Sequence, residues 1–133
     1  MNFNNQFEQL NLSAEYWEQL APVVASIGRW IWNLDSGICQ IDETLKDLTG
    51  WPHNNLEFPA QSFLDRIHPD DLTHVNEAVQ STIDTSVAYR TQFRFVRFDK
   101  SIIWFDGRGA IIDFEDGNRY LAGVNFDISE YKT

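Results

Sequence analysis

The last third of the chain contains three long segments in which apolar and polar residues alternate. They read AYRTQFRFVRF, SIIWFDGRGAIIDF and RYLAGVNFDI, and the stretches DKS and EDGN separate them. Alternation with a period of two is the pattern of a strand that buries one face, and Asp-Gly is a strong hairpin signal. The sequence therefore predicts three consecutive antiparallel strands whose apolar face must be covered by other elements.

Two shorter strands and a short helix are predicted earlier in the chain. RWIWNL and ICQI have strand character, and Ser36-Gly37 between them indicates a turn. DETLKDLTG predicts a helix that begins after Asp42 and ends at Gly50, because Asp caps helix N-termini and Gly ends helices. WPHNNLEFPAQSF carries two prolines and predicts a loop with at most one helical turn.

A longer helix is predicted in LDRIHPDDLTHVNEAVQSTID. Pro69 suits its first turn, where Asp70 and Asp71 complement the positive end of the helix dipole. Its expected buried side consists of Ile67, Leu72, Val75, Val79 and Ile83. The order of elements predicts an α+β fold with a five-stranded antiparallel sheet and helices on one face.

Residues 1–26 predict an amphipathic helical segment in front of the folded domain, which we assign to residues 27–133. Ser13 is the expected cap, Pro22 is expected to kink the helix, and Gly28 is expected to end it. The apolar stripe of this segment comprises Tyr16, Trp17, Leu20, Val23, Val24 and Ile27. A stripe of this kind needs a partner surface.

The overall composition excludes several classes of protein. The 133 residues suffice for one domain, and no apolar run approaches the ~20 residues of a membrane span. Without a signal pattern, a cytoplasmic location is the default. The net charge of −10 argues against nucleic-acid binding, and three dispersed histidines argue against a metal site. Cys39 is expected to be a buried core residue rather than a reactive thiol.

The succession of segments resembles a PAS domain, over roughly Ile27 to Lys132. The segments are RWIWNLDSG, ETLKDLTGW, FLDRIHPDD, YRTQFRFVRFDKSIIWF, GRG and LAGVNFDISEYK. The chain is most similar to the bacterial sensory-box branch that ends in an Asp-Ile-Thr-Glu-Arg-like signature. It departs from that pattern at Ser129, where Thr is usual, at Tyr131, where Arg is common, and at Asp99-Lys100, where Asp-Gly is usual.

The resemblance implies a sensory or interaction module that is not itself an enzyme. Such domains pass a change in ligand occupancy or dimer packing to an effector on the same polypeptide, such as a histidine kinase or a GGDEF diguanylate cyclase. A structural dimerisation domain with a packed core and no ligand is the alternative. A small enzyme with a cone-shaped α+β fold would need a buried acid or histidine, and the expected inward positions hold none.

The resemblance also implies which residues line a ligand pocket, because Asn125 matches a glutamine that touches the flavin in light-sensing relatives. The inward, ligand-binding set is then Phe93, Phe95, Ile103, Phe105, Leu121 and Asn125. A buried amide without a partner costs about 1–3 kcal/mol. Asn125 is therefore expected to bond a ligand, a water molecule or a neighbouring backbone group. A packed core, a small ligand and a permanent cofactor all remain open.

The known cofactors of the family can be weighed separately. Cysteinyl-flavin chemistry is excluded because the matching segment, PAQSFLDRI, has no cysteine. Haem-binding relatives use a histidine on the long helix, but His74 is expected to be a solvated helix residue. Trp30, Trp32 and Trp51 could flank the ring of a non-covalent FAD, but core packing is the better explanation for them.

Residues of opposite parity are expected on the outer face of the sheet. Val96, Trp104, Val124 and Phe126 would form an apolar patch there, beside Arg94, Asp106 and Arg108. We expect the leading helix, through residues such as Trp17 and Leu20, to cover this patch on its own chain or on a second copy. A homodimer joined through these helices would account for both apolar surfaces.

The end of the last strand is the expected signal output. SEYK predicts a first helical turn capped by Ser129. In the family, an Asp-hydroxyl pair anchors the start of a linker to the effector, which implies roles for Asp127 and Ser129 and a basic partner, for which Arg108 is the candidate. The chain is then expected to stop where an output helix begins. A plain helix cap without a signalling role is the alternative.

Overall fold

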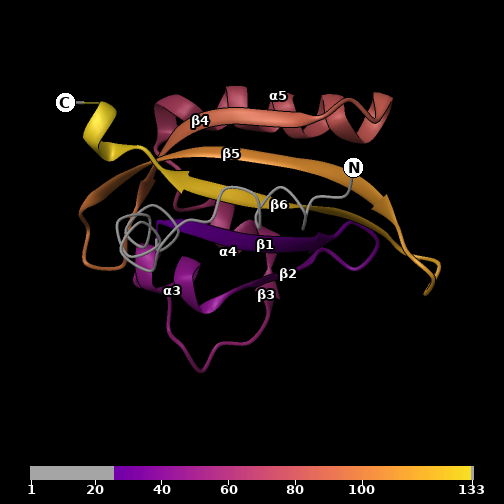
Figure 1. Cartoon of the computed structure of the whole chain (residues 1–133), viewed down its shortest axis with the longest axis horizontal. Helices are drawn as coiled ribbons and strands as arrows, with labels where there is room; N and C mark the ends of the chain where they lie inside the picture. Colours follow the sequence, from indigo (N-terminus) through magenta and orange to yellow (C-terminus); the bar gives the residue numbers. More distant parts are fainter. Residues whose placement is uncertain (1–25, 133) are drawn as a thin grey trace, which may run out of the picture.

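The structure is a computed structural model that describes residues 26–132. Its elements, in chain order, are β1 (Ile27–Asn33), β2 (Ile38–Ile41), α3 (Glu43–Thr49), β3 (Phe58–Pro59), α4 (Ala60–Leu64), α5 (Pro69–Thr85), β4 (Tyr89–Val96), β5 (Ile102–Asp113), β6 (Arg119–Asp127) and the 3-10 helix η1 (Ser129–Tyr131). One curved antiparallel sheet has the order β3-β2-β1-β6-β5-β4, with α5 beside β4 (Figure 1). Of the predicted leading helix only Ser26 and Ile27 are described, and Ile27, the last residue of its predicted apolar stripe, belongs to β1 instead.

The predicted α+β fold is confirmed, with one more strand than expected. The sheet has six strands instead of five, because Phe58 and Pro59 pair with Cys39 and Ile38. This β3 lies in the segment that we predicted as a loop. Proline is tolerated there because β3 forms the edge of the sheet. None of the helices in residues 26–132 has both the length and the apolar character needed to cross a membrane.

Gly28 corrects the sequence prediction, because it lies inside β1 and does not end a helix. A Cβ atom at this position would lie 2.5 Å from Cβ of Leu45 on α3. The absence of a side chain therefore lets α3 approach the inner face of β1. The predicted boundaries of α3 are confirmed: Asp42 Oδ1 accepts from Leu45 N at 2.9 Å, and Gly50 has φ +75°.

The outer edge of β4 is covered by hydrogen bonds from the segment that leads into α5. His68 N donates to Arg94 O at 2.8 Å, and Asp71 Oδ2 accepts from Arg94 N at 2.7 Å. His74 Nε2 contacts the carbonyl oxygen of Gln92 at 2.8 Å, so the imidazole donates there. An uncovered edge strand would be open to pairing with another chain. The HPDD segment therefore closes one side of the sheet.

The hydrophobic core lies between the helices and the inner face of the sheet. Its most completely buried apolar side chains are Phe93, Phe95, Phe105, Leu45, Ile103, Leu121 and Val75. The predicted buried side of α5 is present: Val75 and Val79 are buried, while Leu72 and Ile83 pack against the core. Alternate residues of β4, β5 and β6 supply one wall of this core, as the alternation of the sequence predicts.

Replacing Gly28 by Ala tests the contact between α3 and β1. The new methyl group collides with Leu45, so we expect the free energy of unfolding to fall by about 1–3 kcal/mol. Urea unfolding of the wild type, Gly28→Ala, Leu45→Ala and the double variant gives the measurement. Because the nearest atoms are Cβ and Cα of Leu45, which alanine keeps, Gly28→Ala should destabilise the Leu45→Ala background as well. A Gly28→Ala variant as stable as the wild type would contradict this account.

Candidate functional site

A cavity of about 60 Å³ lies between the inner face of the sheet and the helices. Its lining residues are Trp30, Trp32, Cys39, Ile41, Phe58, Ala60, Phe63, Leu64, Ile67, Val75, Val79, Tyr89, Phe93, Leu121 and Asn125. The wall is apolar and aromatic, and among residues 26–132 Asn125 contributes its only amide side chain, beside the phenol of Tyr89. An apolar hollow with a few placed polar groups is the usual character of a small-molecule site.

Only part of the predicted pocket lines this cavity. Phe93, Leu121 and Asn125 belong to its wall. Phe95, Ile103 and Phe105 point inward and are fully buried, as predicted, but they lie in the packed core beside the cavity. Phe95 does not reach the cavity because the ring of Phe63 on α4 lies in front of it. The centroids of the two rings are 4.6 Å apart.

Trp30 and Trp32, which we considered as flanks of an FAD ring, do line the cavity, whereas most of the other lining residues come from elements that the sequence analysis did not assign to a site. Val75 and Val79 on α5 were predicted to be buried, and their spacing was the available signal. Ile41, Phe58 and Ala60 are placed by the pairing of β2 with β3, which involves only two residues. A contact as short as this leaves no periodic pattern in the sequence, so the wall at this side could not be predicted.

Asn125 is buried, with an exposed fraction of 2%. Its Oδ1 accepts a hydrogen bond from Trp30 Nε1 at 3.0 Å, so its partner is a side chain on the neighbouring strand rather than the ligand, water or backbone group that we expected. Gly107 leaves room for the amide, since a Cβ there would lie 3.0 Å from Oδ1. The NH₂ group of Asn125 donates to no residue between 26 and 132, which leaves two donors at the cavity wall.

Replacing Asn125 by Leu should destabilise the domain by about 1–3 kcal/mol, because the Trp30 N–H would then be buried without an acceptor. Adding Trp30→Phe removes the orphaned donor and should recover part of that loss. Chemical unfolding of both single variants and the double variant provides the measurement. If Asn125→Leu alone is as stable as the wild type, the buried hydrogen bond has no energetic role.

The cavity does not accommodate a haem or an FAD in this conformation. Its 60 Å³ would hold on the order of four or five water molecules, whereas sites for larger organic ligands measure about 300–1,000 Å³. His74 is exposed and bonds to Gln92 O, away from the lining residues. Trp51 packs on Phe58, with ring centroids 4.2 Å apart, and does not line the cavity.

Cys39 lines the cavity from β2, and its burial raises the pKa of the thiol to about 12. The side chain therefore stays a neutral thiol at physiological pH, whereas nucleophilic chemistry needs the thiolate. This agrees with the prediction of a buried structural cysteine.

The outer face carries the predicted apolar residues, but cations lie against its aromatic rings. Val96, Trp104, Val124 and Phe126 are half-buried. The Trp104 ring has two cations against it: the guanidinium of Arg94 lies 5.1 Å from the ring centroid, and the ammonium of Lys132 lies 4.9 Å from it. The guanidinium of Arg108 lies 5.6 Å from the ring centroid of Phe126. These rings are therefore engaged in cation–π contacts. Trp17 and Leu20, the expected docking partners, lie outside the described residues.

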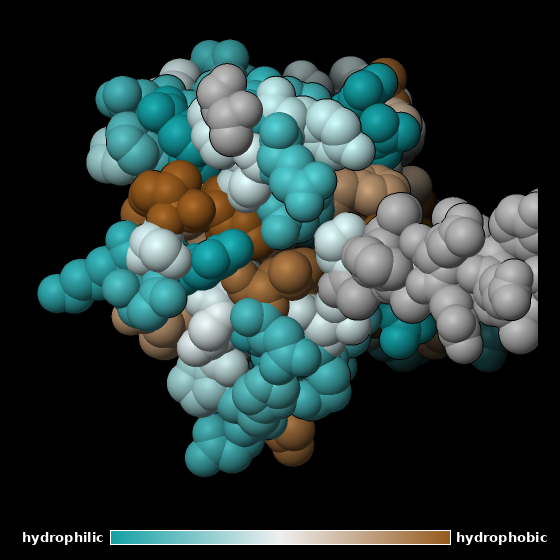
Figure 2. Space-filling model, turned by 60° about the vertical axis from the view of Figure 1, so that its left-hand side comes forward, coloured by the Kyte–Doolittle hydropathy of each residue, from teal (hydrophilic) through white to brown (hydrophobic). Residues whose placement is uncertain are grey.

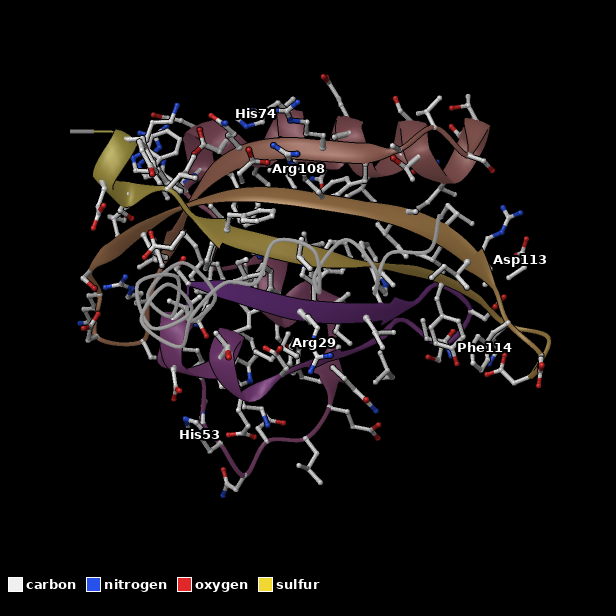
Figure 3. The ribbon with its side chains drawn as sticks, in the orientation of Figure 1. Arg29, His53, His74, Arg108, Asp113 and Phe114 are labelled. Carbon is white, nitrogen blue, oxygen red and sulfur yellow. The ribbon has the colours of Figure 1, made fainter. Side chains whose placement is uncertain are left out.

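The predicted pairing of Arg108 with Asp127 is wrong. Arg108 Nε donates to Asp106 Oδ1 at 3.4 Å, and Gln92 Nε2 donates to Asp106 Oδ2 at the same distance (Figure 3 labels Arg108). Asp106 points outward, as expected, but only 5% of it is exposed. Residues 106 and 108 lie on the same face of β5, which brings their charges together.

Asp127 and Ser129 instead organise the turn that follows β6. Asp127 Oδ1 accepts from Ser129 N, the first residue of η1, at 3.0 Å, whereas the N-cap residue of η1 is Ile128, so Ser129 is not the cap that we predicted. Ser129 Oγ accepts from Trp104 N at 3.1 Å, while Ile128 N donates to Trp104 O at 2.9 Å. The predicted helical turn is present as a 3-10 helix, and both of its side-chain contacts fix it to β5 or to itself.

Asp71 is a linking residue that the sequence analysis used only as a helix-dipole partner. It is 5% exposed and holds Arg94 with two side-chain bonds of 2.8 and 2.9 Å. The Arg94 guanidinium keeps the pKa of Asp71 at about 2. Asp71 lies one turn before Val75 of the cavity wall, and Arg94 lies over Trp104. One set of contacts therefore joins the cavity to the strand that holds η1.

The Asp71 pKa predicts how stability depends on pH. A carboxyl whose pKa is lowered on folding stabilises above its unfolded value, near 3.8, and loses that contribution as the pH falls towards 2. We expect Asp71→Asn to lower the free energy of unfolding by about 2 kcal/mol at pH 7, with the difference shrinking between pH 4 and pH 2. Urea unfolding at several pH values measures it. A difference that does not change with pH would contradict the ion-pair account. Asp84→Asn on the same helix is the control, since within residues 26–132 Asp84 bonds Gln80 alone.

Comparison with known proteins identifies the family. Residues 38–125 match the family described as PAS fold. The chain belongs to the PAS family. The match covers the cavity wall from β2 to Asn125, and the resemblance to a PAS domain that the sequence predicted is confirmed.

Several PAS-containing proteins are similar to this chain. Sensor protein FixL of Bradyrhizobium diazoefficiens is 28% identical over 109 residues, which is 80% of this chain but only 21% of FixL. This PAS chain thus spans about a fifth of that relative. A sensory box histidine kinase/response regulator from Burkholderia thailandensis is 25% identical, with a TM-score of 0.70 over 86% of each chain. The N-terminal domain of a diguanylate cyclase with PAS/PAC sensor from Marinobacter aquaeolei shares the fold, with a TM-score of 0.71 at 21% identity over 80% of this chain and 99% of that one.

Proposed function

We propose that this PAS domain is a non-enzymatic sensory module that binds a small molecule in its cavity and controls an effector domain of the same polypeptide. The observation that carries the proposal is Asn125, whose NH₂ group has no acceptor within residues 26–132 although it lies in an apolar cavity. The NH₂ group is reachable from the cavity rather than sealed in the core, so it can donate to an acceptor atom of a ligand there. The ligand expected is small and uncharged, with one acceptor and an apolar body.

The contacts around α5 supply a route from the cavity to the output turn. A ligand that displaces Val75 or Val79 shifts the first turns of α5, where Asp71 holds Arg94. Arg94 lies against Trp104, and the backbone of Trp104 holds Ile128 and Ser129. A ligand acts on this set only through a difference in affinity between two arrangements of it. Signal output is therefore proposed at Asp127 and Ser129, with Arg108 holding Asp106 beside them.

The expected effector is a histidine kinase or a GGDEF diguanylate cyclase. The names of similar proteins support this: two are a sensor protein and a sensory box histidine kinase, and the third is a diguanylate cyclase with a PAS/PAC sensor. We place the module in the cytoplasm, where such effectors find their nucleotide substrates.

A structural dimerisation domain without a ligand is the second candidate. The small size of the cavity favours it, because 60 Å³ is close to what packed cores leave unfilled when they hold a few waters. In this case the Asn125 NH₂ group would bond to buried water.

A thermal-shift screen of small uncharged compounds separates the two functions. A ligand present at 100 times its Kd should stabilise the domain by about 2.7 kcal/mol. Val79→Phe, which fills the cavity from α5, should abolish that shift, while Asp84→Asn on the outer side of α5 should preserve it. A binder whose shift survives in Val79→Phe would place the site elsewhere. A broad screen without any shift would favour the structural domain.

We also propose that the domain works as a homodimer joined through its leading helices. The apolar stripe of residues 16–27 and the exposed apolar residues of the outer sheet face support this. Multi-angle light scattering should give twice the chain mass for residues 1–133 and a single chain mass after deletion of residues 1–25. A monomer in both cases would contradict the proposal.

A further inference from the structure

The cavity has a polar end, where Tyr89 on β4 lies beside Asn125 on β6. Both side chains line the cavity, and they are 6% and 2% exposed. β5 runs between these two strands, and Gly107 of β5 pairs with Asn125. A Cβ atom placed on Gly107 would lie 3.0 Å from Asn125 Oδ1 and 3.3 Å from Cε1 of Tyr89. The missing side chain therefore lets the phenol ring and the amide come together above the same residue.

Each of these two side chains presents a polar group without a partner. Within residues 26–132 neither the Tyr89 hydroxyl nor the Asn125 NH₂ group makes a hydrogen bond, and neither is sealed in the core. The orientation of the amide is fixed, because Trp30 Nε1 donates to Oδ1 and a reversed amide would set two donors against each other. The Trp30 ring also meets the Tyr89 ring edge-on, with centroids 5.7 Å apart. Both polar groups are therefore held in place and open to a molecule in the cavity.

The charges around this end of the cavity favour a neutral ligand. Among the residues that the structure describes, no aspartate, glutamate, lysine or arginine lines the cavity. Burial raises the pKa of the Tyr89 phenol, and the charge of Asp106 adds to this, so the hydroxyl keeps its proton. The same negative charge disfavours a carboxylate or a phosphate beside the phenol. On the surface, by contrast, apolar patches lie between hydrophilic side chains (Figure 2). An uncharged molecule with an apolar body is therefore matched to the cavity.

The size of the cavity limits the ligand further. Room for four or five waters corresponds to roughly 120–150 Å³ of liquid, which is close to the size of an apolar cavity that holds a benzene ring. A molecule of about six non-hydrogen atoms therefore fits the cavity as it stands. Its apolar body would contact aliphatic residues of the wall, such as Val75, Val79 and Leu121.

We propose that the cavity selects a neutral carbonyl compound with an apolar body of about five carbon atoms, and that Tyr89 determines this selectivity together with Asn125. A carbonyl oxygen has two lone pairs, so it can accept from the Asn125 NH₂ group and from the Tyr89 hydroxyl at once. It brings no proton that would need an acceptor in the apolar wall. This role of Tyr89 rests on the proposed function, because it requires that the domain binds a small molecule.

Two molecules of the same shape test the role of Tyr89 in the full chain: cyclopentanone, and methylenecyclopentane, in which a CH₂ group replaces the carbonyl oxygen. Nuclear magnetic resonance titration, followed on the Trp30 indole signal, gives a Kd for each. Tyr89→Phe keeps the ring and removes the hydroxyl, so cyclopentanone should bind about three- to tenfold more weakly, and methylenecyclopentane should not. Tyr120→Phe is the matched control, because the Tyr120 hydroxyl bonds Asp116 Oδ2 at 2.6 Å outside the cavity, and neither Kd should change.

An unchanged Kd for cyclopentanone in Tyr89→Phe, or equal weakening of both molecules, would overturn the role of Tyr89 while leaving ligand binding intact. Binding of methylenecyclopentane alone would overturn the carbonyl class in the same way. If neither molecule binds, the carbonyl class also fails, and the proposed function fails with it only if the broad screen gives no shift. The wild type supplies a readout that needs no variant: cyclopentanone, but not methylenecyclopentane, should move the Asn125 side-chain amide protons downfield. Equal responses to both molecules would refute the hydrogen bond.

Discussion

The pairing of β6 on both of its sides is the constraint on which the rest of the structure depends. β6 is hydrogen-bonded to β1 and to β5 along its whole length, so it cannot rotate or slip by one residue. Leu121 and Asn125 are thereby fixed on the inner face, and Val124 and Phe126 on the outer face. The cavity amide of Asn125 and the last residue of β6, Asp127, which bonds the proposed output turn, lie two positions apart on this one strand.

Three hydrogen-bonded polar pairs lie in the sheet or at its edge. Asn125 accepts from Trp30 beside the cavity, Asp71 holds Arg94 at the edge of β4, and Asp106 holds Arg108 on the outer face. Breaking one member of a buried pair costs more than the pair contributes, because the other member is left unpaired. Such contacts have few alternative arrangements, which suits a module that must pass a small displacement over a distance.

Much of the fold could be predicted from local pattern, because strands, caps and turns depend on neighbours in sequence. The alternation in β4, β5 and β6, the cap at Asp42 and the stop at Gly50 are of this kind. Gly28 was misread because a glycine near a predicted helix end and a glycine under a packed helix look alike in sequence. Glycine is needed at position 28 because of the contact with Leu45, and these two residues are seventeen positions apart in the sequence.

The sequence predicted which face of the sheet carries the site, but not which residues line the cavity. Strand parity placed Asn125 and its neighbours inward, and all six predicted pocket residues are buried. Whether an inward residue meets the cavity or solid core depends on Phe63. This residue lies on the short helix α4, in the segment that we predicted as a loop with one helical turn, and no pattern in the sequence showed which way its ring points. The partner of Arg108 was missed for another reason: residues two apart on a strand share a face, and this rule favours Asp106 over Asp127.

The central claim is that the Asn125 amide lies inside the domain, bonded to the indole of Trp30. The most direct measurement is nuclear magnetic resonance of the tryptophan indole N–H groups in the purified protein. The account predicts a nuclear Overhauser contact between the Trp30 indole proton and the Asn125 side-chain amide, with slow exchange of that indole proton with solvent. A Trp30 indole proton that exchanges as fast as free tryptophan, without any contact to Asn125, would contradict it.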